Sequence, residues 1–262
     1  MKTFQDLQEG VYDPNILKAF FLAGGPGSGK SYVVQRTTGG MGMRIVNSDN
    51  EFEKKLKDAG MSLDIRELDP TVRDEIRGRA KKLTAAKKAN YIAGRLGLII
   101  DGTGKDYEKI AYQATQLKQL GYDVHMIFVN TSLDTALERN AQRARKLAEP
   151  LVVSSWKDVQ KNIGKFSQYF KRNFIVVDNN DAGEDVFNSV FKQVKSMAKA
   201  KVQNPTGKSW IANEIAMKRD SGGSGTLGKG RAGTGGKQQK IDPKRLKDIK
   251  KGAFSRFARR TA

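Results

Sequence analysis

Over its first 199 residues the chain alternates between short apolar runs and longer segments with helical periodicity. The apolar runs are continuous, which is typical of parallel strands that are covered on both faces. We expect five strands, at residues 18–23, 43–47, 97–101, 123–129 and 173–178. Helical segments lie near residues 30–37, 50–59, 70–95, 106–119, 132–147, 154–170 and 183–199. The alternation predicts a doubly wound α/β domain with a mostly parallel five-stranded sheet and flanking helices.

The periodicity fails after about residue 200. Residues 221–237 are rich in Gly and Ser and predict a flexible linker, because they hold too few apolar side chains to pack. A short basic helix is expected from Lys244 to about Arg260. We therefore divide the chain into a folded domain, 1–199, and a flexible basic C-terminal tail, 200–262, made of a Gly-rich linker and this helix.

The charge of the chain is concentrated in that tail. The formal net charge is +20, and residues 200–262 hold 16 Lys and Arg against 4 Asp and Glu. Such a segment favours binding of nucleic acid through phosphates, with Trp210, Phe254 and Phe257 as stacking surfaces. A solvating tail or one that docks on a protein is the alternative.

The amino-acid composition excludes some kinds of site, and the apolar pattern indicates where in the cell the protein lies. There are no cysteines, which excludes disulfides and thiolate metal sites, and the single histidine, His125, lies in a strand, where a structural role is usual. The N-terminus lacks a signal-peptide pattern, and no apolar stretch reaches the ~20 residues needed to span a bilayer. We expect a cytoplasmic protein without membrane contact.

Residues 24–31, Gly-Gly-Pro-Gly-Ser-Gly-Lys-Ser, follow the first strand and match the phosphate-loop pattern G-x-x-x-x-G-K-[ST]. Glycines let backbone N–H groups converge on phosphates, and the following helix N-terminus adds partial positive charge. Lys30 would reach the β- and γ-phosphates of ATP, and Ser31 would bind Mg²⁺. The predicted nucleotide-binding residues are Gly24, Gly25, Pro26, Gly27, Ser28, Gly29, Lys30, Ser31 and Tyr32. Two tail segments, 204–209 and 223–229, imitate the pattern without a preceding buried strand, so we interpret them as chance matches.

Two carboxylates are expected at the same edge of the sheet, where ligands of such folds bind. Asp49 follows the second strand and could accept a proton from an attacking hydroxyl or hold a magnesium-bound water; an N-cap is the alternative. Asp101 ends the third strand and could bind Mg²⁺, its waters or the acceptor; a structural turn is the alternative. Gly102 and Gly104 would let the substrate come close.

Arg139 and Arg143 are four residues apart in the helical segment after the fourth strand, so they would share one helix face. On a mobile lid they could stabilise the charge on a transferring phosphoryl group. The alternative is a solvated basic face.

Together these parts resemble the zeta-toxin family of P-loop kinases, with a looser likeness to polynucleotide kinases. The likeness covers roughly residues 15–178. Its stretches are the phosphate loop, the Asp49 segment, residues 98–105, residues 116–122 and the helix with Ala136–Arg139 and its trailing arginines.

The resemblance implies transfer of phosphate from ATP to a sugar hydroxyl of uridine-diphosphate-N-acetylglucosamine. It implies that Asp49 is the general base, that Asp101 and Thr103 bind the substrate, and that the lid arginines are Arg139 and either Arg143 or Arg145. The family usually has glutamate at the position of Asp101. A second substrate-binding acid would fall near Ala85, which cannot bind a ligand.

We expect an ATP- and Mg²⁺-dependent kinase that transfers the γ-phosphoryl group to a hydroxyl of a nucleotide sugar, a nucleotide or a nucleic-acid 5′ end. The predicted catalytic residues are Lys30, Asp49, Arg139 and Arg143, the substrate residues Asp49, Asp101 and Thr103, and the metal ligands Ser31 and Asp101. A toxin role would add an antitoxin-type protein partner. The alternative is a nucleic-acid-associated or structural protein with a regulatory nucleotide site.

Overall fold

The computed structural model describes residues 11–13, 15–64, 68–143, 146–181 and 183–222. Its parallel strands form one five-stranded sheet in the order β2-β3-β1-β4-β5. The strands are β1 Lys18–Ala23, β2 Arg44–Val46, β3 Leu98–Asp101, β4 Asp123–Asn130 and β5 Phe174–Asp178. Each lies where a continuous apolar run predicted a strand, so the predicted sheet is confirmed.

Seven helices lie near the predicted segments, and one 3₁₀ turn, η2 Lys171–Asn173, precedes β5. The helices are α1 Lys30–Thr38, α2 Ser48–Asp58, α3 Pro70–Ala93, α4 Tyr107–Gln119, α5 Leu133–Ala141, α6 Glu149–Phe170 and α7 Glu184–Lys199. The predicted helix 132–147 ends early, at Ala141. The side chain of Asn140 holds the following turn, since it donates to the carbonyl oxygen of Leu147 (2.8 Å) and accepts from its N–H (3.2 Å).

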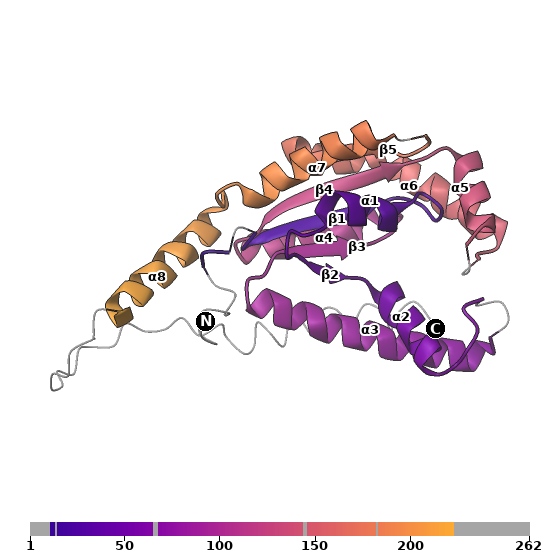
Figure 1. Ribbon diagram of the computed structural model, residues 1–262, viewed down its shortest axis with the longest axis horizontal. Coiled ribbons are helices and arrows are strands. Elements are labelled where there is room, and N and C mark those ends of the chain that lie inside the picture. Colours follow the sequence, from indigo (N-terminus) through magenta and orange to yellow (C-terminus); the bar gives the residue numbers. More distant parts are fainter. Residues whose placement is uncertain (1–10, 14, 65–67, 144–145, 182, 223–262) are drawn as a thin grey trace. The chain divides into compact units, whose positions relative to one another are not determined.

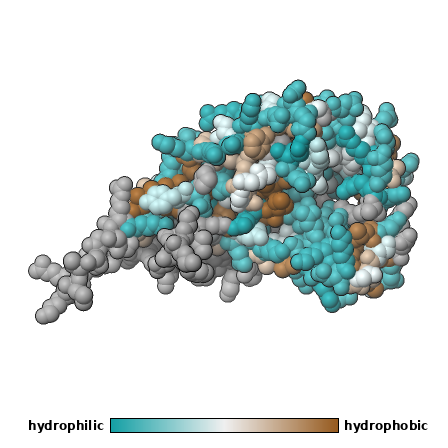
Figure 2. Space-filling model, in the orientation of Figure 1, coloured by the Kyte–Doolittle hydropathy of each residue, from teal (hydrophilic) through white to brown (hydrophobic). Residues whose placement is uncertain are grey.

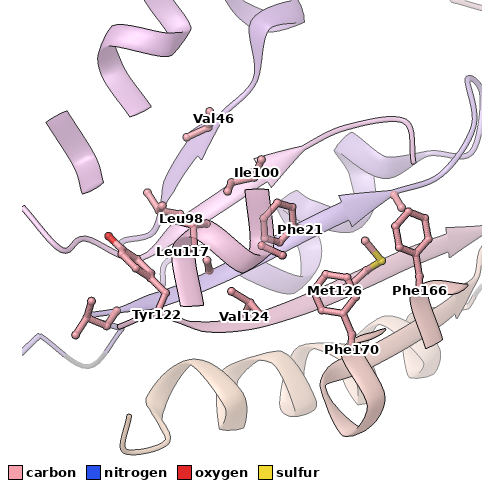
Figure 3. Close-up of a cluster of buried hydrophobic side chains, with 14 of the residues drawn as sticks. Phe21, Val46, Leu98, Ile100, Leu117, Tyr122, Val124, Met126, Phe166 and Phe170 are labelled. Carbon is pink, nitrogen blue, oxygen red and sulfur yellow. The ribbon is translucent and has the colours of Figure 1, made fainter. Parts of the chain in front are cut away.

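Helices cover both faces of the sheet (Figure 1). On one face, side chains such as Phe21 and Met126 pack with Phe166 and other residues of α4 and α6 (Figure 3). On the other face, Phe20 and Ile127 pack against α1 and α7. Burial on both faces explains why β1 and β4 are apolar at successive positions rather than at alternate ones.

Helices α2 and α3 form a small hydrophobic cluster of their own. Phe52, Leu56 and Ala80 are buried in it, and partly buried side chains, among them Ile76, surround them. This cluster fixes α2 against α3 beside the carboxyl end of β2, independently of the main core. Residues 49 and 77, on the two helices, are brought together by it.

The packed domain extends beyond residue 199, where the sequence predicts its end. Val202 is buried in the main core, and Trp210 of a further helix, α8 Pro205–Gly222, packs against the same core. Trp210 also lies 5.5 Å from the guanidinium carbon of Arg95, so it serves packing rather than an exposed stacking surface. The tail expected from residue 200 is thus helical up to Gly222. The linker from residue 223 onward and the basic helix near 244–260, with Phe254 and Phe257, lie outside the described residues.

The phosphate-loop imitation at 204–209 is a helix start. Oδ1 of Asn204 accepts from the backbone N–H of Thr206 at 3.0 Å, which caps α8. The second imitation, 223–229, lies outside the described residues.

His125 is a core residue, as its position in a strand predicts. It is 5% exposed and stacks on Phe20 with ring centroids 4.7 Å apart. The face drawn in Figure 2 is mostly hydrophilic, with scattered hydrophobic patches. Within the described part of the chain, no helix has the length and apolar character needed to cross a membrane.

Candidate active site

The loop between β1 and α1 has a backbone that glycine adopts readily and other residues rarely do. Gly27 and Gly29 have φ angles of 79° and 80°. A Cβ at Gly27 would lie 2.1 Å from the carbonyl oxygen of Ala136, and one at Gly29 would lie 2.3 Å from Nδ2 of Asn179. The loop therefore packs closely on α5 and the β5–α7 segment and ends at the N-terminus of α1, where N–H groups favour anions.

The side chain of Lys30 folds back over this loop. Its Nζ donates to the carbonyl oxygens of Gly24 (2.6 Å) and Gly25 (3.1 Å). Pro26 and Ser28 complete the loop and are buried, whereas Ser31 is exposed on the first turn of α1. The ammonium group and the helix N-terminus thus lie on the same short loop, as binding of a polyphosphate requires.

Asn47 connects the two predicted carboxylates. Its Oδ1 accepts from the backbone N–H of Asp49 (2.7 Å), which caps α2, while its Nδ2 donates to Oδ2 of Asp101 (2.6 Å). Asp49 therefore lies in the first turn of α2 and is not the N-cap that we considered as its alternative. Asn47 is not among the site residues predicted from the sequence, although an asparagine just before a helix is a capping signal.

Asp101 lies in a charged but poorly solvated place. Burial raises the pKa of its carboxyl; the charge of Asp49 raises it further, and Lys30 and Arg143 oppose the change. Its Oδ1 is buried and has no hydrogen-bond partner among the described residues. The charges of three other predicted site residues, Lys30, Asp49 and Arg143, thus all act on the carboxyl of Asp101.

These residues also fit the predicted magnesium site. Mg²⁺ takes oxygen ligands and in nucleotide sites needs only one or two from the protein. Asp101 offers Oδ1, and Ser31 offers its hydroxyl near the phosphate loop. No group of three or more His, Cys, Asp or Glu side chains that could hold a metal lies within the described ranges.

Arg77 of α3 contacts a predicted site residue, Asp49, although it is not itself among the residues predicted from the sequence. Its Nη2 lies 3.5 Å from Oδ1 of Asp49, and its guanidinium carbon lies 5.4 Å from the centre of the Phe52 ring. No local signal marks Arg77, because α3 carries many basic residues and only packing decides which of them meets α2.

The glycines of the loop after β3 were expected to let a substrate come close, and the structure gives Gly104 another role. Gly104 has φ of 83°, and a Cβ there would lie 2.7 Å from the Cβ of Ala23. It is thus required for packing against β1 rather than for close approach of a substrate. Thr103 is exposed, and its carbonyl oxygen accepts from the N–H of Gly24 (3.0 Å), so this loop is tied to the phosphate loop. A Cβ at Gly102 would meet only ordinary contact, 3.7 Å from Leu22.

The two arginines have different surroundings. Arg143 lies beyond the end of α5 and near Asp101, so the two do not share a helix face as predicted. Arg139 donates to the carbonyl oxygens of Asn179 (2.6 Å) and Asn180 (2.8 Å). Arg145, the other predicted lid residue, lies outside the described residues.

Arg139 borders a pocket of about 450 Å³ beside the phosphate loop. The segment after β5 forms one wall of the pocket, and Tyr32 forms part of another. The rings of Tyr32 and Phe187 meet edge to face, with their centroids 5.2 Å apart. The lining residues are Gly29, Tyr32, Arg139, Asn179, Asn180, Asp181 and Phe187. The pocket is open, mixed in polarity and next to the loop, as a site for a nucleoside would be.

Comparisons with known proteins agree with this geometry. Residues 20–165, more than half of the chain, match the AAA_33 family, described as an AAA domain. A comparison with curated proteins gave no significant match.

Solved structures are similar to this chain at low sequence identity. The AvrRxo1-ORF1:AvrRxo1-ORF2 complex with sulphate ions has a TM-score of 0.50 and 12% identity, covering 75% of this chain and 80% of that one. A gluconokinase from Sinorhizobium meliloti 1021 has a TM-score of 0.42 and 12% identity, covering 78% and 98%. A chain of the Pnkp1/Rnl/Hen1 RNA repair complex has a TM-score of 0.46 and 18% identity, covering 58% and 47%. This chain belongs to the AAA_33 family, and its parallel sheet, flanking helices and phosphate loop form a P-loop kinase-like domain.

Proposed function

We propose that the protein is an ATP-dependent kinase that transfers the γ-phosphoryl group to a hydroxyl acceptor. The observation that supports this proposal is the link that Asn47 makes between the backbone of Asp49 and the carboxylate of Asp101, whose pKa also responds to the charge of Lys30 in the phosphate loop. A site that only binds a nucleotide needs the loop, whereas phosphoryl transfer also needs a group that orients or deprotonates the acceptor.

Each residue has a defined part in the transfer. Asp49 takes the proton of the acceptor hydroxyl while the acceptor oxygen forms a bond to the γ-phosphorus. The bond from that phosphorus to the β-phosphate oxygen breaks, and ADP leaves with the electron pair. Lys30 and Arg143 stabilise the negative charge on the transferring group, and Asp101 and Thr103 orient the acceptor. Magnesium, held by Ser31 and Asp101, supplies further charge neutralisation when bound.

For Arg139 we propose a role in addition to the one that the sequence predicts. Its contacts with the segment after β5, and its place beside Gly29, support a role in holding the nucleoside of ATP. Tyr32 would contact the same nucleoside from α1. Stabilisation of the transferring phosphoryl group is proposed for Arg143 and stays a prediction for Arg139.

The acceptor class follows from the resemblance to zeta toxins and polynucleotide kinases: a nucleotide sugar, a nucleotide or a nucleic-acid 5′-hydroxyl. A zeta-toxin-like activity would bring with it an antitoxin-type partner. The basic residues beyond 222 support nucleic-acid binding, since they hold 12 Lys and Arg against 2 Asp.

Incubation with γ-labelled ATP and a panel of these acceptors tests the proposal. We expect one acceptor to be labelled, and Asp49→Asn to lower kcat roughly 100-fold or more, because a positioned general base contributes about that much. Binding of ATP should persist in the variant, since the predicted ATP-binding residues lie in the phosphate loop and Asp49 lies in the first turn of α2.

Asp58→Asn is the matched control, because Asp58 is exposed at the other end of the same helix. Its activity should equal that of the wild type. Tight binding of ATP without labelling of any acceptor would overturn the kinase proposal and favour a regulatory nucleotide site.

A further inference from the structure

Asn179, the residue directly after β5, contacts three parts of the candidate active site. Its backbone N–H donates to the carbonyl oxygen of Asn130 at the end of β4 (2.8 Å), and its own carbonyl oxygen accepts from Nη1 of Arg139 (2.6 Å). Its side-chain Nδ2 donates to the carbonyl oxygen of Ser28 in the phosphate loop at 2.8 Å. Asn179 is 5% exposed, so these hydrogen bonds are shielded from bulk water.

The contact with Ser28 fixes the direction of a peptide group in the phosphate loop. The peptide bond between Ser28 and Gly29 is trans, and in a planar trans peptide the C=O and N–H bonds point in opposite directions. Because the carbonyl oxygen of Ser28 points to Asn179, the N–H of Gly29 points away from the segment after β5. Gly29 is the N-cap residue of α1, so this N–H lies among those at the helix N-terminus, where anions bind.

The amide of Asn179 fits closely on the end of the loop. A Cβ at Gly29 would lie 2.3 Å from Nδ2 of Asn179, so the amide packs against the bare Cα of the glycine. The hydroxyl of Ser28 does not hold this part of the loop, since its Oγ is buried and has no hydrogen-bond partner among the described residues. The segment after β5 therefore holds the loop through the side chain of Asn179.

We propose that Asn179 is a positioning residue for ATP, whose amide aims the N–H of Gly29 at the phosphates. This inference rests on the proposed binding of ATP at the phosphate loop, but not on transfer of phosphate to an acceptor. Asn179 acts through the loop backbone and need not touch the phosphates itself. Without the amide, the buried carbonyl oxygen of Ser28 loses its donor. The peptide group can then turn that oxygen toward the phosphates, which repel it.

Calorimetry with a non-hydrolysable ATP analogue, with inorganic tripolyphosphate and with adenosine tests this inference. Asn179→Leu and Asn179→Asp both remove the Nδ2 donor at similar side-chain size, and both keep the backbone carbonyl that accepts from Arg139. Each should weaken binding of the ATP analogue and of tripolyphosphate roughly 10- to 100-fold, as expected for a lost hydrogen bond to a charged group. Adenosine has no phosphate, so its affinity should change less than about threefold.

Asn173→Leu is the matched control, because Asn173 makes the same kind of hydrogen bond at the opposite end of β5. Its Nδ2 donates to the carbonyl oxygen of Val124 at 3.0 Å. The control should lose stability in urea unfolding but keep the wild-type affinity for the ATP analogue. A loss of that affinity in the control as large as in Asn179→Leu would overturn the inference, since general destabilisation would then explain both.

Three further outcomes would overturn the inference. An equal loss for adenosine and the ATP analogue would show that Asn179 acts on the nucleoside. A loss in Asn179→Asp alone would trace the effect to the added negative charge, and an unchanged affinity in Asn179→Leu would show that the donor is not needed. If Asn179→Leu does not fold, Asn179→Ala takes its place as the uncharged variant.

Turnover separates this inference from the kinase proposal. With an acceptor that is labelled, Asn179→Leu should raise the KM for ATP, while kcat changes less than about threefold. If the variants lose affinity as expected but the wild type labels no acceptor, the kinase proposal fails and the positioning role stands. If an acceptor is labelled but Asn179→Leu binds the ATP analogue as the wild type does, the positioning role fails alone.

Discussion

Asn47 shows how one side chain can organise a candidate active site. Its oxygen caps the helix that carries Asp49, and its nitrogen binds the carboxylate of Asp101. The amide supplies an acceptor to one neighbour and a donor to the other, which neither aspartate nor serine does in the same geometry. The relative position of the two carboxylates thus depends on Asn47, a residue for which no catalytic role is proposed.

Burial of His125 destabilises the folded protein at low pH. Burial lowers its pKa to about 4, the Lys18 ammonium adds to the effect and Asp123 opposes it. Neither imidazole nitrogen has a hydrogen-bond partner among the described residues. A free histidine has a pKa of about 6.5, so the unfolded chain binds the proton first and stability falls between about pH 6.5 and pH 4.

The free energy of unfolding of the wild type should fall between pH 7 and pH 4. We predict that this fall is about 3 kcal/mol smaller in His125→Leu. Urea unfolding at both pH values in wild type and variant measures the difference. Carboxylates elsewhere contribute equally to both proteins and cancel. The same pH dependence in both proteins would show that His125 is not buried as described.

At the scale of elements, α8 is attached by polar contacts at the start of β4. The carboxylate of Asp123 binds the Lys18 ammonium and accepts from the backbone N–H groups of Gln203 and Asn204, each at 2.8 Å. These contacts satisfy a buried lysine and position the first turn of α8. Gly207 then lies against the turn between α4 and β4, where a Cβ would be 2.3 Å from the carbonyl oxygen of Gly121.

We predict that Gly207→Ala lowers the free energy of unfolding by about 1–3 kcal/mol, because α8 must move away from Gly121. Gly164→Ala is the control: Gly164 lies inside α6, and a Cβ there meets nothing within 4 Å. That change should stabilise the protein by about 0.4–1 kcal/mol. Chemical denaturation measures both, and a neutral Gly207→Ala would contradict the close approach.

At the scale of the molecule, the predicted binding residues lie at the carboxyl edge of the sheet, while the start of α8 contacts Asp123 at the opposite edge. Parallel strands produce this division, because all their carboxyl ends meet on one side. We propose that the basic segment beyond residue 222 forms a second functional part.

Removal of residues 223–262 tests that division. We expect the truncated protein to keep its unfolding temperature and ATP affinity, and to lose at least tenfold in affinity for single-stranded RNA or DNA at 50 mM salt. The cut must follow residue 222, because Val202 and Trp210 pack on the core. Filter binding across salt concentrations measures the effect, and unchanged nucleic-acid affinity would contradict the role of the tail.

Most of the fold is legible in the sequence because it depends on local patterns. Continuous apolar runs gave all five strands, and the run from Gly24 to Ser31 identified the loop, since glycine spacing and the preceding strand are local features. The error at the end of α5 has a local cause too, in the capping of a turn by Asn140. Helix α8 was not predicted from the sequence, because it has only a weak apolar face and its packing depends on residues far away along the chain.

The sequence by itself determined the α/β class, the phosphate loop and the two carboxylates, since each follows from neighbours along the chain. Only the tertiary structure decided that Asn47 meets Asp101, that Arg77 meets Asp49, and that Arg139 reaches Asn179. These pairs are 54, 28 and 40 residues apart, and no local pattern encodes them. Burial of the apolar surfaces fixes how the helices pack against the sheet and against one another. That packing then decides which polar side chains come into contact.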